Sequence, residues 1–453
     1  MINLFEYQNK VRVEESLDNL EIFLDDIWNS RERNSFYSDT NDDKIESQRF
    51  LQFIHKNNEL KSNKYVGAIH FEGKNINLLP KIFYDGEKDY SGEVGQIQNH
   101  ILWWLSYCRK IKFPNYQTSL GSNKNDFFEA LIYLFAKYTR ELLNNSIYQQ
   151  YEEINKELSF IKGRLNINEY ITENLSKGRW HMLNCTYDAF VFDNEFNRII
   201  KYVTNLLFNV TASPESKKNL RDILFILDEV SDVRATAEQC ARISFNPMFG
   251  EFETVRDYCH LFLNNSISID HKNNLKLFAF LLPMEYVFED FIFGFIDREL
   301  KEITAKSQRS DIYLDESKAF NLKPDLFLST EKSNLIADTK YKIIYSNEND
   351  PKKGISQNDL YQMLAYAMRF KVKEIILFYP NTVTQHQQKV AELVIKDDLA
   401  GGEEIYIKAF LLPILNKELL TQPLDSTMRL DSLFASTRLA LISKFNEIFK
   451  VDI

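Results

Sequence analysis

Residues 321–342 read NLKPDLFLSTEKSNLIADTKYK, two runs rich in apolar residues separated by the polar segment Glu331-Lys332-Ser333. Short runs of this composition, bounded by turn-forming residues, are typical of β-strands. We therefore expect two strands, Asn321–Thr330 and Asn334–Lys342, joined by a tight turn. The expected hairpin would bring together the acidic residues that the two runs contain.

Those acidic residues occur in two triplets, Lys323-Pro324-Asp325 and Asp338-Thr339-Lys340. Because side chains alternate along a strand, Asp338 and Lys340 are expected on one face, and the partner strand can bring Asp325 beside them. Two converging carboxylates repel unless a cation lies between them, and Mg2+ prefers oxygen ligands. Lys340 adds a fixed positive charge, or a proton acceptor if its pKa falls. Either triplet alone is common in turns and on solvated strands.

The elements expected on either side of the hairpin complete the order helix, three strands, helix, strand. They are a helix Leu281–Leu300, a first strand Asp311–Asp315, a helix Ser356–Phe370, and strands Glu374–Tyr379 and Ile405–Leu412. This αβββαβ order, a mixed sheet flanked by helices, resembles the PD-(D/E)xK nuclease core. The resemblance implies Mg2+-dependent hydrolysis of DNA, with Mn2+ as a substitute metal and with Asp325, Asp338 and Lys340 as the catalytic residues.

The second of these helices carries Gln362 and Tyr366 one turn apart. Their spacing resembles the QxxxY element that some branches of the PD-(D/E)xK superfamily carry. In this chain we expect the two side chains to contact the DNA backbone or to brace the acidic residues.

Further blocks lie outside the hairpin. The amino-terminal part contains Tyr65–Phe71 and Ile76–Ile82, which ends in Leu-Pro-Lys-Ile, and then Leu102–Tyr107. Later blocks are Lys162–Leu165, Phe192–Arg198 and Met284–Phe291. Together these pieces resemble the McrC family, the nuclease subunits of McrBC-type restriction systems, over about residues 65–380. The related LlaJI-type systems share this architecture.

The McrC resemblance implies a two-component, modification-dependent restriction system for antiviral defence. In such a system this chain would be a type II/IV-like restriction endodeoxyribonuclease that cuts double-stranded DNA, with 5-methylcytosine as an expected mark. Its implied partner is a McrB-like AAA+ GTPase ring that the amino-terminal region contacts. Our candidate contact is the polar hairpin tip Glu72, Gly73, Lys74 and Asn75, although the same hairpin fits the edge of a small barrel equally well.

The resemblance also bears on the remaining metal ligands. Glu289 occupies the acid position of a Val-Phe-Glu block that resembles the family, and it is the expected metal ligand from the helix before the hairpin. The backbone carbonyl of Thr339 is expected to bind the same metal. Glu285 lies four residues earlier on the same helix face and competes with Glu289.

Length and composition set the outer bounds of the fold. A chain of 453 residues with 44% hydrophobic content can bury a sizeable core and should form two or three domains. We expect a multidomain α+β and α/β protein with a β-rich amino-terminal partner-contact domain over 1–125. A helical connecting region over 126–274 and a nuclease domain with a carboxy-terminal extension over 275–453 would follow.

Charge and missing motifs exclude several function classes. The net charge of −10 gives no basic footprint, so DNA affinity should depend partly on the partner. None of the 13 glycines lies in a GxxxxGK[ST] pattern, so this chain is not expected to bind a nucleotide.

No signal peptide or membrane-spanning run is visible, which favours the cytoplasm. Reduced thiols rather than a zinc or iron–sulfur site are expected, because no CxxC pair occurs among Cys108, Cys185, Cys240 and Cys259.

Two rival functions belong to other classes. The first is a non-catalytic scaffold that only activates an AAA+ GTPase, and the intact Asp325, Asp338 and Lys340 set argues against it. The second is a stand-alone DNA repair or processing nuclease, which needs a basic DNA track of its own. The acidic charge balance disfavours that second function.

Overall fold

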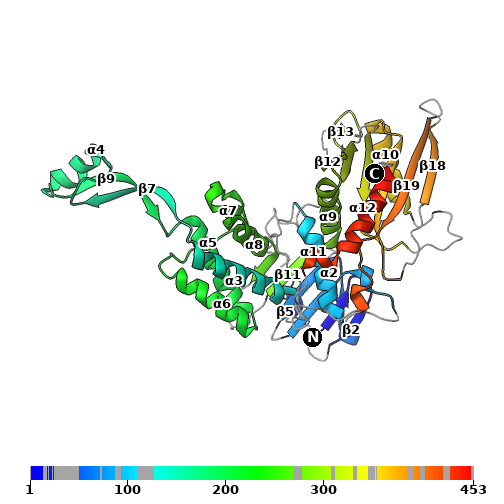
Figure 1. The fold of residues 1–453 in the computed structure, drawn as a ribbon, viewed down its shortest axis with the longest axis horizontal. Coiled ribbons are helices and arrows are strands. Elements are labelled where there is room, and N and C mark those ends of the chain that lie inside the picture. The colour runs from blue at the N-terminus through cyan, green and yellow to red at the C-terminus, as the bar shows by residue number, and fades with distance from the viewer. Residues whose placement is uncertain are drawn as a thin grey trace. The chain divides into compact units, whose positions relative to one another are not determined.

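The computed structural model divides the chain into two compact units (Figure 1). Unit 1 comprises Met1–Ala130 and Asn264–Ile453, and unit 2, Leu131–Leu263, is inserted between them in the sequence. The described residues are 2–13, 18, 20–22, 24, 50–71, 74–86, 93–109, 127–268, 278–307, 312–329, 334–344, 352, 355–384, 391–397, 403–421 and 429–449.

The first sheet of unit 1 is built around the predicted amino-terminal hairpin. Its strands lie in the order β1 (Ile2–Phe5), β6 (Lys74–Leu79), β5 (Tyr65–Phe71), β11 (Phe278–Pro283) and β10 (Ser266–Ser268). Strands β5 and β6 pair antiparallel, as the hairpin requires, and β1 runs parallel to β6. Strands β10 and β11 follow unit 2 in the sequence, so segments on both sides of the insertion complete one sheet. A smaller sheet of β2 (Lys10–Arg12), β4 (Glu59–Ser62) and β3 (Leu51–Ile54) shares its core.

The helix expected at Leu281–Leu300 is shorter than predicted and begins later, as α9 (Met284–Glu299). Leu281 belongs instead to β11, where it pairs with Gly67 of β5. An apolar run fits a buried strand and a buried helix equally well, so its composition could not set this boundary.

Helix α2 (Val94–Tyr107) carries two adjacent tryptophans, both buried. Trp103 stacks on Phe434, with 4.7 Å between ring centroids, and the Nε1 of Trp104 donates a hydrogen bond to the carbonyl oxygen of Ile414 at 3.3 Å. Phe434 and Ile414 both belong to the carboxy-terminal segment, which contains α11 (Leu430–Leu433) and α12 (Ala435–Phe449). These contacts join the two ends of unit 1.

The second sheet of unit 1 contains the predicted acidic hairpin. Its strand order is β12 (Thr304–Ser307), β15 (Leu326–Ser329), β16 (Asn334–Thr339), β17 (Glu374–Pro380), β19 (Glu403–Leu412) and β18 (Ala391–Asp397). Strands β15 and β16 pair antiparallel, β16, β17 and β19 run parallel, and helix α10 (Gln357–Phe370) connects β16 to β17. Alternate residues of β17 contact opposite helices, since Leu377 shares a core cluster with α10 whereas Phe378 packs on Phe445 of α12.

Two strand predictions in this sheet are wrong in part. Asp311–Asp315 was expected to supply the first strand, but β13 (Ile312–Tyr313) pairs only with β14 (Asn321–Leu322) in a separate small sheet. The position beside β15 belongs to β12, whose sequence Thr-Ala-Lys-Ser carries little strand signal and depends on its neighbour. The run expected to form one strand is divided into β14 and β15 at Pro324, which lacks an N–H for the ladder. The predicted turn Glu331-Lys332-Ser333 lies outside the described residues.

Unit 2 combines helices with a β-sheet that the sequence did not reveal. Its helices are α3 (Phe127–Asn145, which begins in unit 1), α5 (Glu195–Val210), α6 (Pro214–Ile226), α7 (Ala237–Arg242) and α8 (Phe252–Asn265). Between α3 and α5, strands β7 (Gln150–Leu158), β9 (Leu183–Val191) and β8 (Arg164–Leu165) form a three-stranded sheet. We call residues 150–191 the arm, because in Figure 1 they extend away from the helices of unit 2. The prediction that residues 126–274 form a helical connecting region is therefore wrong for the arm.

The described helices include none that combines the length and the apolar character needed to cross a membrane.

Candidate functional site

The acidic hairpin brings Asp325 and Asp338 together. The register of β15 and β16 pairs Leu326 with Ala337, so the next positions along the two strands are Asp325 and Asp338. The Oδ2 of Asp325 accepts hydrogen bonds from the backbone N of Thr339 at 2.8 Å and from its Oγ1 at 2.7 Å. Asp325 is thereby held against the end of β16, as predicted.

Asp338 is a buried carboxyl with free coordination capacity. Its side chain is 1% exposed, and its Oδ2 lies 2.5 Å from the Nζ of Lys340. Among the described residues, neither oxygen accepts a hydrogen bond of normal geometry. Burial, and next the charge of Asp325, raise the pKa of Asp338 to about 7, although Lys340 opposes this. A buried carboxyl with unused lone pairs, beside a second carboxylate, is suited to a divalent cation.

Helix α9 contributes the third acidic side chain. Glu289 is buried, and its charge acts to raise the pKa of Asp338. Glu285 is exposed and acts instead to raise the pKa of Glu6 and of Tyr341. Of the two candidates, Glu289 is therefore the one whose charge acts on Asp338. Within the part of the chain that the structure describes, no three His, Cys, Asp or Glu side chains gather closely enough to hold a metal ion by themselves.

Lys340 acts as a cation at this site. Burial alone would lower the pKa of Lys340, but the carboxylates of Asp338 and Asp325 outweigh burial and raise it. Its Nζ donates a hydrogen bond to the Oε1 of Gln362 at 3.1 Å. The alternative role of Lys340 as a proton acceptor is disfavoured, because that role requires a lowered pKa.

Gln362 and Tyr366 both belong to the same network. The Nε2 of Gln362 donates to the hydroxyl of Tyr366 at 2.8 Å, and this hydroxyl donates to the carbonyl oxygen of Lys323 at 3.0 Å. Tyr366 is buried, whereas Gln362 is exposed at the start of the network. The two side chains thus brace the segments that carry Lys340 and Asp325.

One further ion pair near this network was not predicted. The Nζ of Lys342 lies 2.9 Å from both carboxylate oxygens of Asp359, in the first turn of α10. The backbone N of Asp359 donates to the Oγ of Ser356, which caps the helix. The Ser356 cap is visible in the sequence, but the long-range pairing of Asp359 is not.

Comparison with known proteins gives the family. The family model described as "McrBC 5-methylcytosine restriction system component" matches residues 60–380. The chain belongs to this family. No curated protein matches the sequence.

Solved structures with a similar fold come from the same kind of system. One is a refined half-complex from a tetradecameric assembly of Thermococcus gammatolerans McrB AAA+ hexamers with bound McrC. That match has a TM-score of 0.63 and 17% sequence identity, and it covers 98% of this chain and 99% of the other. A second, the cryo-EM structure of the Thermococcus gammatolerans McrBC complex, has 18% identity and a TM-score of 0.49, and it covers 66% of this chain and 88% of the other.

The hairpin tip proposed for partner contact in this McrBC family member is only partly described. Glu72 and Gly73 lie outside the described residues. Lys74 and Asn75 belong to β6, where their backbones pair with Phe71 and His70 of β5.

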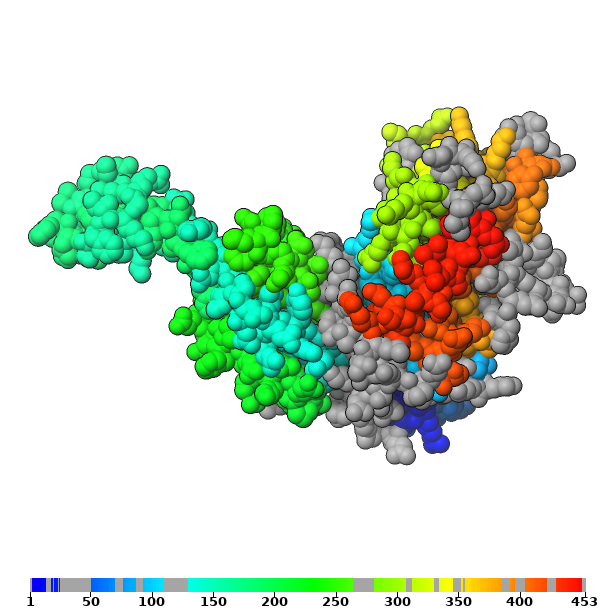
Figure 2. Space-filling view, in the orientation of Figure 1, coloured from blue at the N-terminus to red at the C-terminus, as the bar shows by residue number. Residues whose placement is uncertain are grey.

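The arm of unit 2 exposes several large apolar side chains and buries two asparagines. In Figure 2 it ends as a rounded body on a narrow neck that leads to the helices of unit 2. Buried inside it, the Nδ2 of Asn174 donates to the Oδ1 of Asn184 at 2.6 Å and to Glu157 at 2.9 Å. Large apolar side chains are exposed instead, at Tyr151, Phe160, Ile161, Ile167, Ile171, Leu175, Trp180 and Phe190. Many exposed large apolar side chains within one small sheet are typical of an interaction site.

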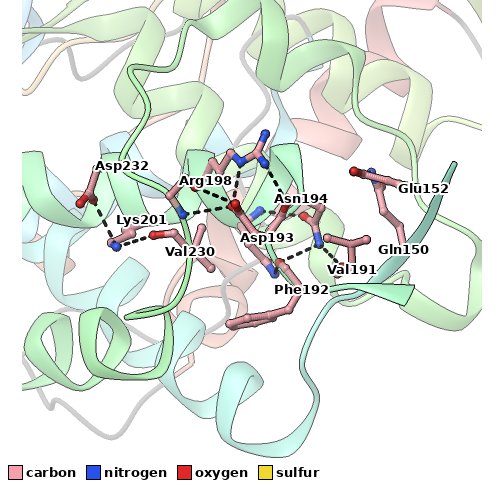
Figure 3. A network of polar contacts seen from close by, with 12 residues as sticks. Gln150, Glu152, Val191, Phe192, Asp193, Asn194, Arg198, Lys201, Val230 and Asp232 are labelled. Atoms are coloured by element: carbon pink, nitrogen blue, oxygen red, sulfur yellow. Dashed lines mark hydrogen bonds and ion pairs between the residues drawn. The ribbon is translucent and has the colours of Figure 1, made fainter. Parts of the chain in front are cut away.

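The root of the arm is fixed by two asparagines of the Phe192–Arg198 block, of which Figure 3 labels the first, Asn194. The Nδ2 of Asn194 donates to the carbonyl oxygens of Tyr148 at 3.3 Å and Val191 at 3.2 Å. The Nδ2 of Asn197 donates to Tyr148 at 2.9 Å and to Phe192 at 2.8 Å. Because Tyr148 precedes β7, and Val191 and Phe192 lie at the end of β9, the asparagines hold both ends of the arm at the start of α5. This family-like block therefore has a structural role in unit 2.

Proposed function

We propose that this chain is the DNA-cleaving subunit of an McrBC-type restriction system, a Mg2+-dependent endonuclease with a PD-(D/E)xK core. The observation that carries the proposal is the convergence of Asp325, Asp338 and Lys340 at adjoining ends of β15 and β16. The strand order around them supports it, since α9, β12, β15, β16, α10 and β17 follow the αβββαβ order. Nothing in the packing of a sheet requires two acids and a lysine at this point.

The donor set fits a hard divalent cation. Asp325 and Asp338, the carbonyl of Thr339 and the nearby Glu289 would hold Mg2+, with Mn2+ as a substitute, and water and DNA phosphate oxygens would complete the coordination. The bound metal would polarise the scissile phosphate and lower the pKa of the attacking water. Lys340 would orient that water and stabilise the negative charge that develops on the phosphate oxygens. Hydrolysis would leave a 5′-phosphate and a 3′-hydroxyl.

The charge of the chain favours a partner that delivers the DNA. A net charge of −10 disfavours strong binding to the phosphate backbone by this chain alone. We propose a McrB-like AAA+ GTPase ring as that partner, because McrC in a structure of similar fold is bound to McrB AAA+ hexamers. The ring would contribute nucleotide hydrolysis, which this chain cannot supply without a phosphate-binding loop. A cytoplasmic location suits a system that acts on DNA.

Two surfaces are candidates for the ring contact. The first is the polar hairpin tip of residues 72–75, which includes the first two residues of β6. The second is the arm, whose exposed apolar side chains would be covered in a complex. The exposed apolar surface favours the arm, since polar tips of this kind are common on proteins without partners.

The decisive test is cleavage of double-stranded DNA containing 5-methylcytosine by the full chain with the ring and GTP. Wild-type protein should cut in Mg2+ and stop in a chelator. Asp338→Asn, Asp325→Ala and Lys340→Ala should each lose more than about a hundredfold in rate, because single charge-stabilising contacts already contribute that much. Asp431→Asn, which changes an exposed aspartate of α11, is the control and should cut normally.

The same experiment separates the rival functions. A chain that stimulates GTP hydrolysis but never cuts in Mg2+ or Mn2+ would be a scaffold. A chain that cuts unmodified DNA equally well without the ring would be a stand-alone nuclease. Unchanged cutting by Asp338→Asn would exclude the proposed catalytic site.

A further inference from the structure

A buried hydrogen bond links the first sheet of unit 1 to the segment that follows β16. Glu6 directly follows β1, and Tyr341 directly follows Lys340. The hydroxyl of Tyr341 donates to the Oε2 of Glu6 at 3.0 Å, and both side chains are almost fully buried. A buried carboxyl is stable only where its polar atoms have partners, so this contact needs a specific geometry on both sides.

Lys81 completes the contact. Its backbone N donates to the same Oε2 of Glu6 at 3.1 Å, and its ammonium lies 4.4 Å from the ring centroid of Tyr341. The Lys81 side chain is buried although charged. A buried cation needs a nearby anion and a polarisable surface, and here Glu6 supplies the first and the Tyr341 ring the second. Lys81 belongs to the Leu-Pro-Lys-Ile block. This block therefore has a structural role, since it supplies a partner to both Glu6 and Tyr341.

The same block also contacts the end of the neighbouring strand. The backbone N of Val383, in the segment after β17, donates to the carbonyl oxygen of Ile82 at 3.1 Å. The backbone N of Lys340 donates to the carbonyl oxygen of Phe378 in β17 at 2.8 Å. The chain after Thr339 is therefore held on one side by β17 and, through Tyr341, on the other side by the first sheet. Lys340 itself makes the attachment to β17, and the next residue makes the attachment to the first sheet.

We propose that Glu6, Lys81 and Tyr341 form a joint through which the first sheet positions Lys340 and Asp338 for metal binding and cleavage. The inference rests on the proposed nuclease function and assigns Glu6 and Tyr341 as positioning residues, since neither contacts the site of reaction. Loss of the joint would free the backbone at residue 341 and loosen the ion pair between Lys340 and Asp338. Displacements of about 1 Å at a reacting group can lower a rate by about a hundredfold.

The test uses the full chain and compares Tyr341→Phe with Tyr84→Phe. Tyr341→Phe removes the hydroxyl and keeps the ring over Lys81. Tyr84 directly follows the short 3-10 helix Lys81–Phe83. Its hydroxyl makes no hydrogen bond to the described residues, so Tyr84→Phe is the matched control. A second pair, Glu6→Gln and Glu6→Ala, asks whether an acceptor oxygen without the charge restores part of the function.

Two readouts distinguish positioning from a general loss of stability. The first is the Mg2+ concentration that gives half of the metal-induced rise in Tm, measured on the chain alone. The second is cleavage with the AAA+ ring, analysed as kcat and as KM for DNA. Tyr341→Phe should raise the Mg2+ midpoint and lower kcat about tenfold with little change in KM. Glu6→Gln should fall between wild type and Glu6→Ala.

The outcomes separate the joint from the proposed function. If wild type binds Mg2+ and cuts through Asp338, but folded Tyr341→Phe matches Tyr84→Phe in both readouts, the joint has no positioning role. If Tyr341→Phe lowers only the Tm, and leaves the Mg2+ midpoint and kcat unchanged, the contact is merely structural and the inference also fails. If wild-type protein neither binds Mg2+ nor cuts, the proposed function itself fails.

Discussion

The hydroxyl of Tyr366 donates a hydrogen bond to the carbonyl oxygen of Lys323 at 3.0 Å, and so ties α10 to the segment that precedes Asp325. It also accepts from Gln362, whose other amide atom accepts from Lys340. One helix therefore contacts both the strand segment of the first acid and the lysine that follows the second. The spacing of Gln362 and Tyr366 is explained by this double contact.

We expect Tyr366→Phe and Gln362→Ala each to lower the cleavage rate about tenfold without unfolding the chain. Each removes two hydrogen bonds, the one between Gln362 and Tyr366 and a second one to Lys340 or to Lys323. A net loss of about 1–2 kcal/mol in positioning corresponds to about this change in rate. Tyr361→Phe is the control, because Tyr361 is exposed on the same helix. Rates should be measured with the ring at saturating Mg2+. Full activity in Tyr366→Phe would show that the hydroxyl does not brace the site.

Metal-free protein should be stabilised by Asp338→Asn at neutral and higher pH. The pKa of Asp338 is raised to about 7, so the folded chain keeps a proton there that the unfolded chain has lost above its ordinary pKa. The contribution of Asp338 to stability therefore falls as pH rises towards about 7, and asparagine removes this dependence. In a chelator, the Tm of Asp338→Asn minus that of wild type should grow between about pH 5 and about pH 8. A difference that stays constant with pH would contradict the raised pKa.

Mg2+ affinity should depend on the same proton. Below a pH of about 7 the metal must displace a proton from Asp338, so the apparent affinity should rise up to about tenfold per pH unit and then level off. Calorimetric titration of wild-type protein with Mg2+ in two buffers of different ionisation enthalpy would detect the released proton. Glu6→Gln should leave this proton release unchanged, because Glu6 titrates separately although its pKa is also about 7.

The sequence predicted the acidic site because its signals are local. Asp325, Asp338 and Lys340 lie in runs with clear strand composition, and Gln362 and Tyr366 are one helical turn apart. Side-chain periodicity alone then determines which of them share a face. Burial, which raises the pKa of Asp338, depends on α9 and α10 and could not be read from these residues.

The remaining features depend on contacts that are distant in the sequence. The Glu6–Tyr341 bond spans 335 positions, and no local pattern in either segment announces it. Strand β12 has too few β-branched residues to be recognised without its partner β15. In the arm, β7 reads Gln-Tyr-Glu-Glu-Ile-Asn-Lys-Glu-Leu, in which charged residues outnumber apolar ones and obscure the alternation.

The arm should be a rigid contact that tolerates no side chain at Gly163. Gly163 has a φ of +69°, and a Cβ at this position would lie 2.4 Å from the carbonyl oxygen of Thr186. Gly163→Ala should therefore distort the arm and weaken association with the ring, while Mg2+-induced stabilisation of unit 1 stays unchanged. Co-elution with the ring in a non-hydrolysable GTP analogue measures the first effect, and thermal melting in Mg2+ the second. A ring complex of wild-type strength would argue against the arm.

The exposed apolar side chains of the arm give the sharpest test of the partner contact. Trp180 is 71% exposed and Phe160 is 59% exposed, so replacing both with alanine removes little packing within the chain. If these side chains anchor the arm to the ring, the double variant should bind at least about tenfold more weakly, as truncation of aromatic interface residues commonly does. Phe225→Ala is the control, since Phe225 is 82% exposed on α6 rather than on the arm. Normal binding by the double variant, together with loss of binding when residues 72–75 are replaced by a minimal Asn-Gly turn, would assign the contact to the amino-terminal hairpin instead.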